Sequence, residues 1–98
     1  MYGRSYPATL ASDGGGFTAT FRDIPEAIAQ GFSILEAKEE ALTALCTAIE
    51  FYFEDKRIVP EPSMIRHGEV WITLDDVMTN EIYTHNEKVL NEYSITQK

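Results

Sequence analysis

The sequence predicts an α+β fold, in which a small antiparallel sheet packs against one face of one long helix. Three observations predict it. Residues 33–55 carry apolar side chains at spacings of three and four, which is typical of a helix with one buried face. Short runs that alternate apolar and polar residues lie before and after this helix, and such alternation is typical of strands. Ninety-eight residues, 44% of them hydrophobic, are enough for one domain with an ordinary core.

The first two strands are predicted at residues 6–11 and 16–21, joined as a hairpin. The turn between them, residues 12–16, contains an aspartate and three glycines, which favour positive φ angles and local hydrogen bonds. A glycine-rich loop also suggests phosphate binding. Here it leads into another strand and not into a helix N-terminus, so we interpret it as a turn.

The third strand is predicted at residues 28–30, with one turn of helix as the alternative for this segment. The long helix follows. Ser33 and Glu36 have the spacing of a capping box, in which each side chain bonds the backbone N–H of the other residue. The helix must end before Pro60, because proline has no N–H and its ring clashes with the preceding turn.

A connector with two prolines, residues 56–68, leads to the fourth strand at residues 69–74. A second helix is predicted at residues 76–92, where the apolar pattern is thinner than in the first. Ser94 has the character of an N-cap for a further helix beyond this sequence.

The formal net charge is −8, and much of it falls on the long helix. A solvated helix face is the plain interpretation, and an acidic docking surface for a basic partner is the alternative. The eight basic residues are scattered, which argues against binding to a phosphate backbone. The acidic residues of the helix, against the single base Lys38, are Glu36, Glu39, Glu40, Glu50, Glu54 and Asp55.

Side chains suited to catalysis are few. Cys46 has no histidine nearby in sequence, and neither His67 nor His85 lies in a nucleophile motif, so no catalytic residue and no cofactor are predicted. A metal-dependent nuclease is the enzyme alternative. Its two-metal chemistry needs a cluster of carboxylates, for which the candidates are Asp13, Asp23 and Glu69.

No apolar run approaches the roughly 18 residues of a membrane span. The N-terminal residues lack the apolar stretch of a signal peptide, so a cytoplasmic protein without membrane association is the expectation.

Several motifs, taken in order and spacing, resemble the N-terminal domain of HicB antitoxins. They are Tyr-Pro-Ala at 6–8, the run GFTATFRDIPEAIAQG at 16–31, the helix end EFYFED at 50–55, Pro-Glu-Pro-Ser at 60–63, and the strand that contains Trp71. The resemblance covers about the first 75 residues.

This resemblance implies a domain like part of an RNase H fold that binds a cognate HicA toxin, a small basic RNA-cleaving protein. Residues 1–75 would be the toxin-binding domain. Residues 76–98 would be a helical linker and the start of an incomplete C-terminal DNA-binding module, of helix-turn-helix or ribbon-helix-helix type, that represses the protein's own operon. The chain would then be truncated, and a purely transcriptional regulator is a further alternative.

The resemblance also implies self-association, for which an edge strand offers a route. The candidate toxin-binding residues combine the acidic residues near the start of the long helix with an aromatic residue of a type enriched at binding hot spots. They are Asp23, Glu26, Glu36, Glu39, Glu40 and Trp71.

Overall fold

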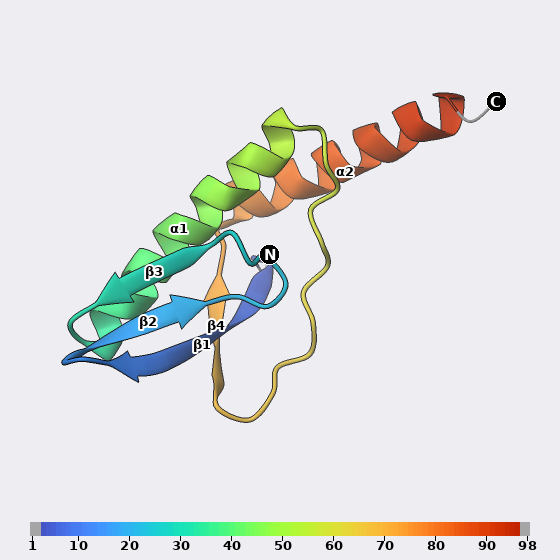
Figure 1. Cartoon of the computed structure of the whole chain (residues 1–98). Helices are drawn as coiled ribbons and strands as arrows, with labels where there is room; N and C mark the ends of the chain where they lie inside the picture. The colour runs from blue at the N-terminus through green and yellow to red at the C-terminus, as the bar shows by residue number, and fades with distance from the viewer. Residues whose placement is uncertain (1–2, 97–98) are drawn as a thin grey trace.

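The structure is a computed structural model that describes residues 3–96, and their side chains as far as residue 92. Four strands form one antiparallel sheet in the order β3-β2-β1-β4, and two helices accompany it (Figure 1). This confirms the predicted α+β fold. The elements are β1 (Ser5–Asp13), β2 (Gly16–Thr20), β3 (Ile28–Gly31), α1 (Ile34–Glu54), β4 (Glu69–Thr73) and α2 (Asp76–Thr96).

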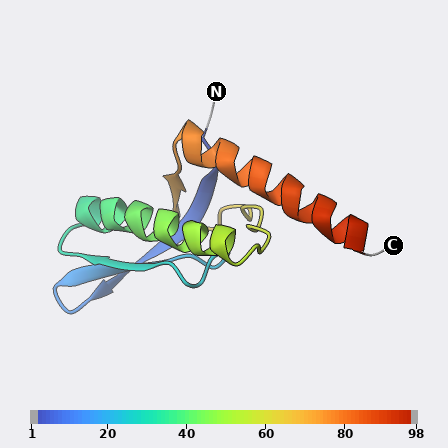
Figure 2. The same ribbon diagram turned by 90° about the horizontal axis from the view of Figure 1, so that it is seen from above.

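The helix α1 lies across one face of the sheet (Figures 1 and 2). Because side chains alternate between the two faces of a strand, Tyr6 and Ala8 of β1 and Ala19 of β2 point toward α1 and are fully buried. The helix contributes its own buried stripe to this core, which consists of Ala37, Ala41, Leu45, Ala48, Ile49 and Tyr52. The predicted pattern of one buried helix face is therefore confirmed.

The other face of the sheet, which we call the open face, is covered only in part: Pro7 of β1 is fully buried there. Trp71 of β4 lies there, opposite Pro7 of β1, and 45% of its surface is exposed. Trp71 is therefore not part of the buried core. Next to this pair, Arg22 binds Glu69 with two hydrogen bonds of 2.8 and 3.0 Å, and this ion pair crosses the open face between β2 and β4.

The segment between β2 and β3 and the connector between α1 and β4 both pack onto the body. Residues 28–31 form a strand, so the helical alternative for this segment is wrong. The connector has no regular structure, as predicted. Its Val59 is nevertheless fully buried and belongs to the core.

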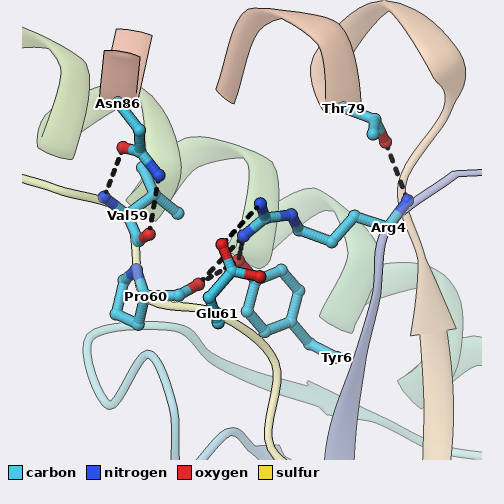
Figure 3. A network of polar contacts seen from close by, with 7 residues as sticks. All are labelled: Arg4, Tyr6, Val59, Pro60, Glu61, Thr79 and Asn86. Carbon is cyan, nitrogen blue, oxygen red and sulfur yellow. Dashed lines mark hydrogen bonds and ion pairs between the residues drawn. The ribbon is translucent and has the colours of Figure 1, made fainter. Parts of the chain in front are cut away.

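A polar network joins the connector to α2 and to the N-terminal residues Arg4 and Tyr6 (Figure 3). Asn86 of α2 accepts a hydrogen bond from the backbone N–H of Val59 and donates one to its carbonyl, at 2.9 and 3.0 Å. The hydroxyl of Tyr6 and the guanidinium of Arg4 both donate to the carbonyl of Pro60, at 2.6 and 3.1 Å. These bonds join segments that are more than twenty residues apart, so they fix the course of the connector.

The helix α2 runs from Asp76 to Thr96 and does not end near residue 92 as predicted. No glycine or proline interrupts residues 76–96, so nothing in the backbone stops the helix. The prediction that Ser94 caps a new helix is wrong, because Ser94 lies inside α2. Met78 and Ile82 of its first half join the core, whereas the second half projects away from the body (Figures 1 and 2).

The Arg22–Glu69 pair makes a pH-dependent contribution to stability. Hydrogen bonds from Arg22 lower the pKa of Glu69 from 4.5 to about 2. A carboxyl with a depressed folded pKa stabilises the fold above its unfolded pKa, and this contribution is lost as the pH falls through the folded value.

We therefore expect Glu69→Gln to lower the melting temperature at pH 7, and the difference from the wild type to shrink between about pH 4.5 and about pH 2. Thermal unfolding followed by circular dichroism measures it, with the exposed Glu54→Gln as control. A difference that stays constant across this range would show that the pair is not the cause.

Candidate protein-binding surface

The outward side of α1 carries two groups of carboxylates, one in its first two turns and one in its last two turns. All of them are solvent-exposed, and they lie on the side of the helix opposite its buried stripe. We call this surface the acidic face and define it as Glu36, Glu39, Glu40, Glu50 and Glu54. At 1.5 Å per residue it extends over roughly 27 Å of helix, and the only base in α1 is Lys38. Such a surface favours a partner with positive charges at complementary positions.

The first turn of α1 has the predicted Ser33 cap, but Glu36 accepts a hydrogen bond from the N–H of Phe32 and not, as predicted, from that of Ser33. The N–H of Glu36 donates to Oγ of Ser33 at 3.0 Å, and the N–H of Phe32 donates to Oε1 of Glu36 at 2.6 Å. The carboxylate of Glu36 thus has a structural role as well as its place on the acidic face. Its position is fixed by the backbone.

Beside this first turn lies a pocket of about 370 Å³. It is a half-open hollow lined by the β1–β2 turn, the end of β3 and the start of α1, and these segments gather at one end of the molecule (Figure 1). We call it the turn pocket. Its lining residues are Asp13, Gly14, Gly16, Phe17, Thr18, Gln30, Gly31, Phe32, Glu36 and Glu40.

The sequence analysis did not single out Phe17 and Phe32, and it considered Asp13 only as a metal ligand of a nuclease. Phe32 is 86% exposed. A hydrophobic residue just before a helix cap usually packs against the fourth helical residue, which here is Ala37. Because alanine is small, it offers Phe32 little surface to pack against, and this pairing was the signal available in the sequence.

Two of the predicted site residues lie elsewhere and have internal bonds. Asp23, after β2, accepts hydrogen bonds from the backbone N–H of Ser63, at 2.9 Å, and from its hydroxyl. It therefore anchors the connector.

Glu26 accepts a hydrogen bond from the hydroxyl of Tyr52 at 2.9 Å and pairs with Arg57 at 3.5 Å. Its pKa is lowered, first by its own backbone N–H and then by the Tyr52 hydroxyl. Both bonds tie the β2–β3 segment to the C-terminal end of α1.

The structure thus brings together three of the six predicted toxin-binding residues, Glu36, Glu39 and Glu40, in the first half of α1. Asp23 and Glu26 lie toward the opposite end of that helix. Trp71 lies on the open face of the sheet, away from α1. A partner that binds the acidic face would therefore reach the first three residues as one patch.

The three carboxylates considered for a nuclease do not meet. Asp13 lies at the β1–β2 turn, Asp23 binds Ser63, and Glu69 is paired with Arg22. Within the described part of the chain, no group of three or more His, Cys, Asp or Glu side chains could hold a metal ion. Burial raises the pKa of Cys46, so this thiol is protonated at neutral pH. Over the same residues, no helix is both long and apolar enough to cross a membrane.

Comparison with known proteins finds a match over residues 5–80 to the family described as "HicB_like antitoxin of bacterial toxin-antitoxin system". The chain is 38% identical to Antitoxin HicB of Escherichia coli K12 over 94 residues, which is 95% of this chain and 67% of that protein. It is 47% identical to Antitoxin HicB 1 of Photorhabdus laumondii over 70 residues, or 70% of this chain and 45% of that relative. Antitoxin HicB 2 of the same organism is also 47% identical, over 67 residues. The matched region thus spans two thirds of the first relative and just under half of the other two.

Proposed function

Because this chain belongs to the HicB-like antitoxins of bacterial toxin–antitoxin systems, we propose that it binds and neutralises a small basic RNA-cleaving toxin of the HicA type. The observation that carries the proposal is the acidic face of α1. A protein that cleaves RNA must bind phosphates with cationic side chains. Carboxylates placed against those cations would take the place of the RNA.

The first half of α1 is the part of this surface best suited to a partner. Glu39 and Glu40 are exposed, and their carboxylates have no hydrogen-bond or ion-pair partner among the residues that the structure describes. Their carboxylates can pair with a toxin without breaking any bond within the antitoxin. Asp23 and Glu26 would have to give up bonds that hold the connector and the end of α1. Their predicted role in binding, and that of Trp71, stays a prediction.

Opposite charges on the two proteins would guide the antitoxin onto the RNA-binding site of the toxin. Opposite potentials speed diffusional encounter and fix the orientation of the complex, and salt weakens both effects. The toxin's RNA site would then be covered by a surface with the same sign of charge as RNA. No catalytic step by the antitoxin is required.

Co-expression with the toxin encoded by the adjacent reading frame tests this function. We expect the two proteins to co-purify and bacterial growth to recover from the toxin's arrest, and we expect the complex to weaken as salt is raised. Failure to co-purify, together with growth that stays arrested, would refute the proposal.

Repression of the antitoxin's own operon is a second proposed activity and needs a C-terminal DNA-binding module. Its support is indirect: the relatives extend beyond the matched region, and the second half of α2 leads away from the body. Whether such a module is of the helix-turn-helix or ribbon-helix-helix type, and whether the protein self-associates, also stay predictions. Operator binding by a longer form and by the 98-residue form, measured side by side, would test the repressor role.

A further inference from the structure

We propose that the turn pocket is the receptor for one arginine side chain of the basic partner. This inference rests on the proposed function, because it assigns one contact of that complex. It adds a definite position and a definite chemistry to a surface that is otherwise known only by its charge.

The pocket is suited to a single side chain. Its volume of about 370 Å³ is at the lower end of the range for ligand pockets and is ample for a guanidinium group on its stem. Its walls come from three rigid features, namely the β1–β2 hairpin, the end of β3 and the capped first turn of α1. A site built on such elements needs little ordering when a partner binds.

The charge of the pocket selects a cation. Asp13, Glu36 and Glu40 line it, and no lysine, arginine or histidine is among the lining residues. Thr18 donates to one oxygen of Asp13 at 3.1 Å, and Glu36 holds the helix cap, so both carboxylates are fixed in place. Glu40 has no partner among the described residues and remains available for a charge-assisted hydrogen bond.

The start of a helix usually attracts anions, because its first N–H groups lack partners. Here the N–H of Glu36 is bonded to Ser33, and the carboxylate of Glu36 itself lies at the helix start. Three carboxylates therefore oppose an anionic ligand, and a phosphate or an acidic peptide does not fit this pocket.

The aromatic residues favour arginine over lysine. Phe17 and Phe32 line the same pocket as the carboxylates, and Phe32 is 86% exposed. An apolar ring of this size left in water is unfavourable, and a contact that covers it gains stability. A planar guanidinium can stack on a ring while its edge bonds a carboxylate, whereas a lysine ammonium cannot do both in a plane.

The pocket can be tested without the toxin. The probe is the capped peptide acetyl-Gly-Arg-Gly-amide, titrated into the ¹⁵N-labelled protein, and its neutral analogue with citrulline in place of arginine is the matched control. We expect the arginine peptide to shift the amide signals of the residues around the pocket with a dissociation constant on the order of millimolar. The citrulline peptide should cause no such shifts.

Three variants make the test specific. Glu40→Gln and Phe32→Ala each remove one contact from an exposed position and are expected to weaken binding of the arginine peptide by roughly fivefold. Glu81→Gln removes an exposed carboxylate from α2, outside the acidic face, and should leave binding unchanged. Equal shifts from the two peptides, or no effect of the two pocket variants, would overturn the proposal.

The complex with the toxin separates this inference from the proposed function. If Phe32→Ala and Glu40→Gln bind the toxin as tightly as the wild type does, the pocket is not the receptor, while the antitoxin role stands. If the wild type does not bind the toxin at all, the proposed function fails, and the peptide titration still decides whether the pocket takes an arginine.

Discussion

Reversing two charges in the first half of α1, with Glu39→Lys and Glu40→Lys together, is expected to weaken binding to the basic toxin by roughly 100-fold. Each substitution replaces an attraction by a repulsion at a position where a cationic partner would lie. Part of the loss should appear in the association rate, because steering depends on the local potential. Surface plasmon resonance at two salt concentrations measures both quantities.

The matched control for this prediction is Glu81→Lys with Glu87→Lys on α2. Both pairs change the formal net charge from −8 to −4, so they have the same effect on overall charge. The control residues are also exposed, and they belong to α2 and not to the acidic face. If both double variants lose affinity equally, net charge and not the acidic face governs binding.

Replacing Gly31 by alanine is expected to cost about 3 kcal/mol of unfolding free energy. A Cβ at this position would lie 2.4 Å from the backbone N of Ala37 and 2.8 Å from the carbonyl carbon of Glu36. These are backbone atoms of α1, so the clash is relieved only by moving the helix away from β3. In a domain of this size the melting temperature should fall by more than about 10 °C.

Gly68→Ala is the control for this substitution. Gly68 has a φ of +88° and nothing within 4 Å of an added Cβ, so alanine there brings only the backbone cost of about 1 kcal/mol. A Gly31→Ala protein as stable as the Gly68→Ala protein would mean that α1 and β3 are not packed as closely as described.

Local sequence patterns were sufficient for most of the fold. The apolar spacing and the capping box located α1 to within one residue at each end, because both signals come from neighbours in the chain. Strand alternation and turn glycines located the sheet in the same way. The end of α2 was predicted too early, since a serine near a helix end was given more weight than the absence of any residue that stops a helix.

The contacts of the connector could not be predicted, because they join residues far apart in the sequence. In the sequence, neither His85 nor Asn86 carries a sign of such a contact. In the structure, Asn86 bonds both backbone groups of Val59, and Nε2 of His85 lies 2.7 Å from the carbonyl of Arg57. A polar side chain that bonds the backbone of a distant segment produces no periodic pattern in the sequence.

Only part of the candidate site was predicted, because the rest of it also depends on contacts between residues far apart in the sequence. The acidic face followed from the spacing of glutamates on one helix. The turn pocket combines the β1–β2 turn, β3 and α1, and only the folded arrangement of these three elements places Asp13 and Phe17 beside Phe32 and Glu40. The internal bonds of Asp23 and Glu26 likewise depend on tertiary contacts.

The most direct test of the central claim is an NMR footprint of the complex. The ¹⁵N-labelled chain would be titrated with an inactive variant of the toxin from the adjacent reading frame. The account predicts that the largest chemical-shift changes fall at residues 13–17 and 32–40, which surround the turn pocket and the first half of the acidic face. Changes confined to α2 or to the open face of the sheet, with α1 unaffected, would contradict it.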